Sequence, residues 1–235
     1  MTAPSQIPVV AIDGPSGSGK GTVSQLLAAR LCWHYLDSGA LYRVVGLAAQ
    51  RAGVDLADAE GVARVARGLR VEFQACNDGP PAVLLDEEDV SGTLRTEACG
   101  DAASRVAAIP AVRQALLHKQ HELRRAPGLV ADGRDMGTTV FPDAIVKVFL
   151  TASPQVRAER RYKQLKEKGF DVNLPQLLDE IRNRDARDAV RAVSPLKPAA
   201  DAHLLDTSDL SISEVVDRIE SLLHQQWSTG GRVNS

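Results

Sequence analysis

IDGPSGSGKGT, residues 12–22, decides the fold of this chain, because a glycine-rich turn here joins an apolar segment to an amphipathic one. Gly14 and Gly19 bracket four residues and Lys20 follows, which is the spacing of a loop that binds phosphate groups. The run PVVAI before the turn predicts a buried strand, and TVSQLLAARL after it predicts a helix. Backbone N–H groups of such a turn converge on an anion, and the helix N-terminus adds partial positive charge. We therefore predict a phosphate-binding loop rather than an ordinary glycine turn, with Lys20 reaching the outer phosphates.

The end of this loop departs from the usual G-K-[ST] pattern. Gly21 stands where a hydroxyl normally binds magnesium, and Thr22 follows one place later, where it can contact a phosphate or a metal-bound water. Mg²⁺ commonly keeps several waters and lies between substrate phosphates. We therefore assign no direct metal ligand and expect Mg²⁺ to be held through nucleotide phosphates and water. The sequence has no NKxD motif, which argues against a GTPase.

The composition is that of an ordinary globular protein. Of 235 residues, 44% are apolar and 25% charged, and the formal charge of −2 gives no reason to expect nucleic acid or an anionic membrane as partner. The apolar runs are too short to span a bilayer, and MTAPSQ does not resemble a signal peptide, so we expect a cytoplasmic protein. Three widely spaced cysteines without a CxxC pair predict reduced thiols. His118 and His121 beside Glu122 imitate a metal site, but without HExxH they indicate a solvated helix face.

Short apolar runs alternate with amphipathic segments, which predicts a parallel sheet with crossover helices. The expected strands are Ile7–Ile12, Trp33–Leu36, Leu129–Asp132, Ile145–Leu150 and His203–Asp206. The expected helices cover 19–31, 39–51, 57–68, 96–107, 110–125, 154–167, 174–191 and 212–226. Residues 69–90 break the alternation and predict two antiparallel strands joined by the turn NDGPP. SISE at 211–214 predicts a capping box, and SP at 153–154 predicts a capped helix start.

Arginines outside the phosphate-binding loop are typical of a kinase whose acceptor substrate already carries a phosphate. Such an enzyme must bring two polyanions together, the donor nucleotide and the acceptor. Ser38 can cap the helix that contains Arg43, although an arginine in that place is often a solvated surface charge. VADGRDMGTTVFP, residues 130–142, puts Arg134 and Asp135 at the carboxyl end of a strand, where ligands of open α/β sheets bind.

A second group of charges lies further along the chain. Arg184, Asp188 and Arg191 share one face of a helix, an arrangement that also suits a solvated face with salt bridges. Residues 153–191 contain ten basic and seven acidic residues, in contrast to the slightly acidic whole. Three arginines there, at positions 157, 160 and 161, are placed to close over phosphates.

Five stretches together, DGPSGSGKGT, LDSGALYR, EDVSGTLRT, DGRDMGT and RDARDAVRAVSPL, resemble the bacterial cytidylate kinases in order and spacing, from about Ile7 to about Leu223. The resemblance implies a three-layer α/β P-loop kinase fold with a five-stranded parallel core, a nucleotide-acceptor insert containing a small antiparallel sheet, and a short lid. It also implies Mg²⁺-dependent transfer of a phosphoryl group from ATP to CMP or dCMP in pyrimidine metabolism, a phosphotransferase reaction with a phosphate acceptor.

The resemblance also implies an arrangement of domains and of site residues. The core would comprise 7–37, 110–152 and 173–227, the acceptor region 38–109, the lid 153–172 and a frayed tail 228–235. The implied ATP-binding residues are Gly14, Pro15, Ser16, Gly17, Ser18, Gly19, Lys20, Gly21, Thr22 and Arg157. The implied CMP-binding residues are Ser38, Arg43, Ser104, Arg113, Arg134, Asp135, Arg184, Asp188 and Arg191. The implied catalytic residues are Lys20, Arg134, Arg160 and Arg161.

Within this set, the acceptor phosphate would be held by Arg43, Arg134 and Arg191. The cytosine would be read by Ser104, Arg113 and Asp135, and the sugar held by Arg184 with Asp188. Asp37 would support the acceptor site.

Two alternatives remain at this point. One is a uridylate or shikimate-type kinase, against which Asp135 and the 69–90 insert argue. The other is a non-catalytic ATP-binding regulator, which has no need of the arginines outside the loop and the lid. We expect ATP and CMP or dCMP as partners, no nucleic acid, no membrane, and a monomer.

Overall fold

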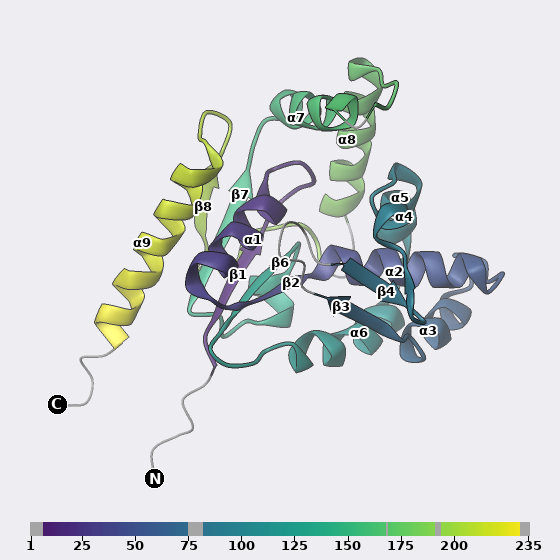
Figure 1. The fold of residues 1–235 in the computed structure, drawn as a ribbon, viewed down its shortest axis with the longest axis horizontal. Helices are drawn as coiled ribbons and strands as arrows, with labels where there is room; N and C mark the ends of the chain where they lie inside the picture. Colours follow the sequence, from purple (N-terminus) through teal and green to yellow (C-terminus); the bar gives the residue numbers. More distant parts are fainter. Residues whose placement is uncertain (1–6, 75–81, 168, 191–193, 231–235) are drawn as a thin grey trace, which may run out of the picture. The chain divides into compact units, whose positions relative to one another are not determined.

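The computed structural model describes residues 7–74, 82–167, 169–190 and 194–230, and the chain divides into two compact units (Figure 1). The first comprises Met1–Leu36 and Leu123–Ser235, and the second is Asp37–Glu122. Within the described ranges, no helix is both long and apolar enough to cross a membrane.

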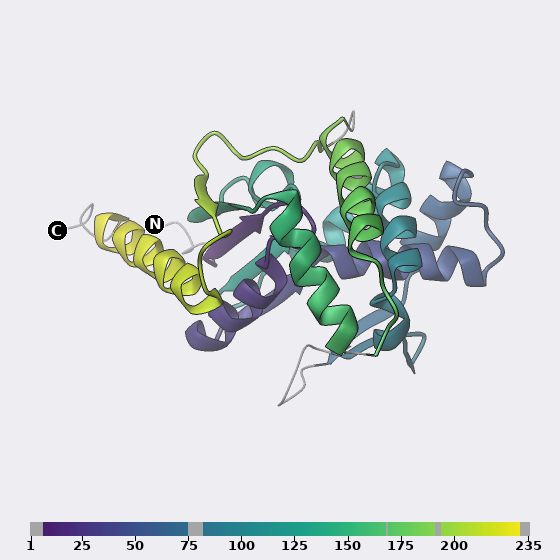
Figure 2. The ribbon, with the colours of Figure 1, turned by 90° about the horizontal axis from the view of Figure 1, so that it is seen from above.

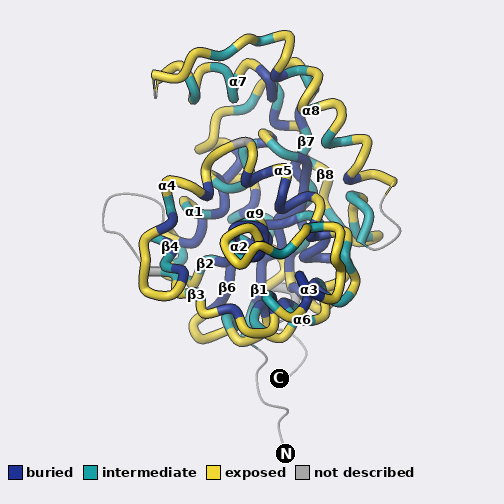
Figure 3. Tube along the Cα trace, turned by 90° about the vertical axis from the view of Figure 1, so that its right-hand side faces the viewer, coloured by how far each residue is buried: buried dark blue, intermediate teal, exposed yellow. Residues whose placement is uncertain are grey.

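The first unit is built on a five-stranded sheet in the order β2-β6-β1-β7-β8, and the pairs β1/β6, β1/β7 and β7/β8 are parallel. The strands are β1 (Val9–Asp13), β2 (His34–Asp37), β6 (Leu129–Gly133), β7 (Val146–Thr151) and β8 (His203–Asp206). Each lies within two residues of its predicted place. β1 and β6 are buried along their whole length, as the dark tube in Figure 3 shows. Continuous burial explains why both strands are apolar runs without alternation.

Helices α1 (Lys20–Leu31) and α9 (Ile212–Gly230) lie side by side on one face of this sheet (Figure 1). The predicted capping box begins α9: the Ser211 backbone N–H donates to Glu214 Oε2 at 2.8 Å, and the Glu214 N–H donates to Ser211 Oγ at 3.3 Å. The sequence predicts that a frayed tail begins at residue 228, but α9 continues to Gly230. The Trp227 ring packs edge-on against Trp33, with centroids 5.7 Å apart, and holds the last helical turns. Residues 231–235 lie outside the described part.

Helices α7 (Pro154–Glu167) and α8 (Leu174–Ala189) pack together in the first unit, seen from above in Figure 2. Ser153 Oγ accepts from the Val156 N–H at 3.2 Å, which confirms the predicted start of α7. Asn173 Oδ1 caps α8 through the Gln176 N–H at 3.2 Å. A turn of π-helix, η1 (Met136–Val140), follows β6 where the sequence predicts only a glycine-rich turn.

The second unit contains helices and a small antiparallel sheet of three strands, in the order β3-β4-β5. The strands are β3 (Val71–Gln74), β4 (Ala82–Leu85) and β5 (Glu88–Asp89). The helices are α2 (Ser38–Arg51), α3 (Ala59–Arg67), α4 (Ser91–Leu94), α5 (Glu97–Val106) and α6 (Pro110–Glu122). The antiparallel insert is confirmed, and its predicted turn at 77–81 lies outside the described residues. β5 is an additional strand, reached through Asp86 and Glu87 at φ 49° and 70°.

Two details correct the sequence predictions in this unit. The sequence assigns 110–152 to the core, but α6 belongs to the second unit, since α6 packs on α3 and Lys119 Nζ donates to the Leu69 carbonyl at 3.1 Å. The cap of α2 is Asp37 rather than Ser38, because Asp37 Oδ1 accepts from the Ala40 N–H at 2.9 Å. Ser38 is the first helical residue, with 3% of its surface exposed.

Candidate active site

The glycine-rich loop between β1 and α1 has a backbone that tolerates few side chains. A Cβ added to Gly14 would lie 2.2 Å from the Leu150 carbonyl oxygen, and Gly19 begins α1 at φ 88°, in the left-handed region. Ser18 is 1% exposed, and its hydroxyl has no hydrogen-bond partner among the described residues. A buried hydroxyl in this condition suits a ligand oxygen. The loop therefore has the shape and the polar groups of an anion site.

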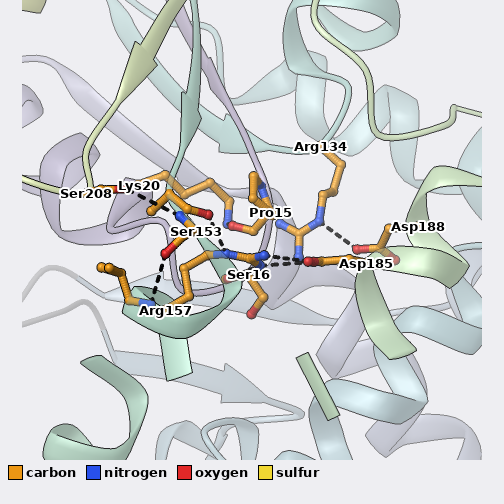
Figure 4. Close-up of polar contacts among 11 residues, drawn as sticks. Pro15, Ser16, Lys20, Arg134, Ser153, Arg157, Asp185, Asp188 and Ser208 are labelled. Carbon is orange, nitrogen blue, oxygen red and sulfur yellow. Dashed lines mark hydrogen bonds and ion pairs between the residues drawn. The ribbon is translucent and has the colours of Figure 1, made fainter. Parts of the chain in front are cut away.

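Lys20 lies at the start of α1 with its ammonium turned back over the loop (Figure 4). Lys20 Nζ donates to the Pro15 carbonyl at 3.2 Å. The cation thus lies beside the backbone that would surround a phosphate.

The position of Gly21 explains the departure from the usual loop pattern. A Cβ at Gly21 would lie 3.4 Å from Asp132 Oδ2 and 4.0 Å from the Tyr35 hydroxyl. Asp132, at the carboxyl end of β6, is 5% exposed, and the Tyr35 hydroxyl donates to Asp132 Oδ2 at 3.1 Å. A carboxylate and a phenol therefore face the residue at which other loops carry a hydroxyl. The sequence places Asp132 in the glycine-rich turn after its strand, but it gives no sign of Tyr35, which comes from a different strand.

Arg134 joins the loop to helix α8 (Figure 4). Its Nη1 donates to the Gly14 carbonyl at 2.9 Å, and its Nε donates to Asp188 Oδ2 at 2.9 Å. The Asp188 side chain is 2% exposed, so this ion pair is largely withdrawn from water. The structure thereby brings together two predicted acceptor residues that are 54 positions apart in the chain. Arg184, one turn earlier on α8, donates to Ser16 Oγ at 3.4 Å.

Arg157 of α7 is buried and donates to the phosphate loop and to helix α8. Its side chain is 3% exposed and donates to the Ala152 carbonyl at 2.9 Å and the Ser16 carbonyl at 3.0 Å. Both carboxylate oxygens of Asp185 also accept from it, at 3.0 and 2.5 Å (Figure 4). This arginine therefore ties α7 and α8 to the phosphate loop. Asp185 has no role in the sequence prediction, because an acid in an alternating charged helix resembles a solvated residue.

Arg160, one turn later on α7, contacts the segment that follows β8. Its guanidinium donates to the carbonyl and hydroxyl of Thr207, the latter at 3.1 Å. Thr207 is 3% exposed, and its hydroxyl lies 3.1 Å from both the Ser18 and the Thr151 carbonyl oxygens. Arg161 follows on the same helix and is half-buried. Arg191 lies outside the described residues.

Four of the predicted acceptor residues belong to the second unit. The Arg43 guanidinium donates to the Leu94 carbonyl, and Ser104 of α5 is 7% exposed. The Arg113 guanidinium lies over the Tyr42 ring at 5.6 Å from its centroid and donates to the Ala107 carbonyl at 3.4 Å. These side chains, together with Ser38, come from helices α2, α5 and α6.

Asp13 is a buried acid that the sequence reasoning overlooked. It ends β1 directly before the loop, is 4% exposed, and accepts the Met136 and Gly137 N–H groups at 2.8 and 2.9 Å. Burial raises the pKa of Asp13 from its ordinary 3.8 to about 6; the two backbone hydrogen bonds and Lys20 act in the opposite direction, and the charge of Asp135 raises the pKa further. Within the described ranges, no three histidine, cysteine or acidic side chains gather into a direct metal site.

Comparisons with a family model and with curated proteins each match most of this chain. Residues 10–225 match the family model described as cytidylate kinase. A cytidylate kinase of Stutzerimonas stutzeri (strain A1501) is 59% identical over 216 residues, covering 92% of this chain and 94% of its own. One from Pseudomonas entomophila (strain L48) is 60% identical over 220 residues, covering 93% and 96% respectively. One from Aeromonas salmonicida (strain A449) is 55% identical over 223 residues, covering 95% and 96%.

Proposed function

This chain belongs to the cytidylate kinase family, and we propose that it transfers the γ-phosphoryl group of ATP to CMP or dCMP, giving ADP and CDP or dCDP. The observation that carries the proposal is the position of Arg134. Its guanidinium contacts the Gly14 carbonyl of the phosphate loop and Asp188 of α8. One cation thereby lies between the loop suited to the donor and a helix suited to the acceptor.

On the donor side, the loop residues Gly14–Thr22 would bind the ATP phosphates. Backbone N–H groups and the N-terminus of α1 supply partial positive charge, and Lys20 supplies a full charge. The buried Ser18 hydroxyl would gain a ligand oxygen as its partner. Lys20 would leave the Pro15 carbonyl for the outer phosphates, because an ammonium pairs more strongly with an anion than with a neutral carbonyl.

On the acceptor side, Asp135 would distinguish cytosine from uracil. A carboxylate accepts from the exocyclic amine of cytosine, whereas uracil presents a carbonyl oxygen at that position. Asp135 is 2% exposed, so a uracil carbonyl in that place would set one buried acceptor against another, at a cost of about 1–3 kcal/mol. Ser104 and Arg113 would share this task.

The other acceptor contacts follow from the same family assignment. Arg43, Arg134 and Arg191 would hold the acceptor phosphate, and Arg184 with Asp188 would hold the sugar. Each guanidinium can form two parallel hydrogen bonds to phosphate oxygens, which fixes orientation as well as charge.

Transfer itself would depend on positioning and charge, since phosphoryl transfer needs no enzyme nucleophile. Lys20, Arg134, Arg160 and Arg161 are the cations we assign to the transferring group. We propose that 153–172 acts as the lid that excludes water from ATP. The contacts of Arg157 and Arg160 to Ser16 and Thr207 support a second role for these two, in anchoring the base of the lid to the loop.

Magnesium fits the residues beside Gly21. A small residue there leaves room against Asp132, a hard oxygen donor of the kind that Mg²⁺ prefers, and Tyr35 orients that carboxylate. When bound, the ion would neutralise charge on the nucleotide phosphates. Tyr35→Phe should raise the Mg²⁺ concentration needed for tight ATP binding in calorimetry, without changing ATP binding in EDTA. Unchanged magnesium dependence would remove Tyr35 from this role.

The proposed reaction is tested with purified protein, Mg-ATP and a panel of CMP, dCMP, UMP, AMP, GMP and shikimate, with ADP release followed. CMP and dCMP should be the preferred acceptors. Preference for UMP would refute the cytidine assignment, and ATP binding without turnover of any acceptor would support a regulator. We further propose a cytoplasmic, monomeric enzyme of pyrimidine nucleotide metabolism.

A further inference from the structure

Asp13 is a buried acid to which the proposed reaction gives no role. It lies at the carboxyl end of β1, in register with Gly133 of β6. Its two oxygens reach past that partner: Oδ1 accepts from the Met136 N–H at 2.8 Å and Oδ2 from the Gly137 N–H at 2.9 Å. One side chain therefore occupies both donors at the start of η1.

The residue after Asp13 contacts the same turn from the other end. The Gly14 carbonyl accepts from Arg134 Nη1 at 2.9 Å. Asp13 and Gly14 thus hold the turn that starts at Arg134 and ends at Gly137 on both sides of Asp135. The Asp135 carbonyl is fixed in turn, because it accepts the Thr139 N–H at 2.9 Å.

A neutral side chain could not replace Asp13 in this arrangement. Asparagine offers one acceptor oxygen, which can satisfy only one of the two backbone N–H groups. Its NH₂ group is itself a donor and would leave the other N–H unsatisfied. An apolar residue would leave both donors unsatisfied. A carboxylate satisfies both, although burying its charge beside Asp135 is costly and Lys20 offsets only part of that cost. A costly charge at this point indicates a function beyond filling the core.

We propose that Asp13 is a positioning residue for the acceptor nucleotide, which holds the turn from Arg134 to Gly137 against the phosphate loop and so sets where Arg134 and Asp135 meet CMP. The inference rests on the proposed function. It adds that the acceptor site is aligned from β1, the strand that also carries the donor loop.

The test compares Asp13→Asn with Asp58→Asn as matched control. Asp58 also accepts a backbone N–H, from Gly61 at 3.0 Å, but it caps α3 in the second unit. Asp13→Asn should raise the KM for CMP by about ten- to a hundredfold, the effect of losing a hydrogen bond to a charged group. The KM for ATP should change less than about threefold, because the phosphate loop keeps its own backbone contacts. The ratio of kcat/KM for CMP over UMP should fall, and Asp58→Asn should change none of these values.

A folded Asp13→Asn with both KM values unchanged overturns the proposal, and so does an equal rise in both, which would indicate a loosened loop. If Asp13→Asn does not fold, Asp13→Glu keeps the charge and displaces it by one methylene. It should raise the KM for CMP selectively, and wild-type kinetics from that variant overturn the proposal. Amide hydrogen exchange at Met136 and Gly137 tests the positioning role of Asp13 separately from the proposed function. Slow exchange in the wild type and fast exchange in the variant supports that role even if CMP is not the substrate. Exchange at the same rate in both proteins, whether fast or slow, overturns the proposal.

Discussion

The stability of the protein should depend on pH in a way that is traceable to Asp13. Its pKa in the folded state is raised by burial to about 6, from an ordinary value of 3.8. The folded protein therefore binds this proton more tightly than the unfolded chain does. The contribution of Asp13 to the free energy of unfolding is fully present below pH 4 and is lost as pH rises through 6.

The magnitude follows from the two pKa values. A difference of about two pH units corresponds to about 3 kcal/mol, of which roughly 2 kcal/mol is lost between pH 4 and pH 7. Asp13→Asn cannot titrate, so it lacks this dependence while keeping that of every other group. The free energy of unfolding of the wild type minus that of the variant should therefore fall by roughly 2 kcal/mol from pH 4 to pH 7.

Urea denaturation of both proteins at half-unit pH intervals, followed by circular dichroism, measures this difference. Exposed acids whose pKa values are lowered, among them Glu88, Asp201 and Glu214, add to the free energy of unfolding as pH rises, which is opposite to Asp13. Their contribution is the same in the wild type and in the variant, so it cancels in the difference. A difference that stays constant with pH, or that grows as pH rises, would refute the reasoning that burial dominates at Asp13.

Three further substitutions test the site. Lys20→Ala should lower kcat by about a hundred- to a thousandfold, the usual loss when a preorganised charge is removed from a transferring group, with an unchanged circular dichroism spectrum; a normal kcat would exclude Lys20 from catalysis. Asp135→Ala should reduce CMP over UMP discrimination by about ten- to a hundredfold, and unchanged discrimination would end its role in base reading. Arg157→Met should lower the free energy of unfolding by about 2–3 kcal/mol. This is less than the loss expected for a fully buried ion pair, because Asp185 is 27% exposed and can turn to water. An unchanged urea midpoint would contradict the anchoring role.

Much of the fold could be predicted because its signals are local. PVVAI must be a buried strand, and the Ser211–Glu214 capping box marks the start of α9 within its own four residues. The antiparallel insert also follows from turn chemistry and alternation. The boundary at α6 could not be predicted, because the chemistry of residues 110–122 does not reveal that they pack on α3.

The positions of Lys20 and Arg134 could be predicted, because a motif places each in a glycine-rich turn, and both side chains contact the loop backbone. Positions that depend on a contact between distant parts of the chain could not be predicted. Asp13 is separated by 123 residues from the N–H of Met136, and no spacing rule connects them. Asp185 likewise gains its meaning only from Arg157 on the neighbouring helix. Three-dimensional pairing thus decides which acids are structural and which face solvent.

The most direct test of the central claim is a competition between acceptors. Limiting Mg-ATP is mixed with equal concentrations of CMP and UMP, and the diphosphate products are separated by ion-exchange chromatography. The proposed base reading by Asp135 predicts CDP in excess over UDP by about tenfold or more, the equivalent of one mismatched buried pair. Equal amounts of CDP and UDP, or an excess of UDP, would contradict it.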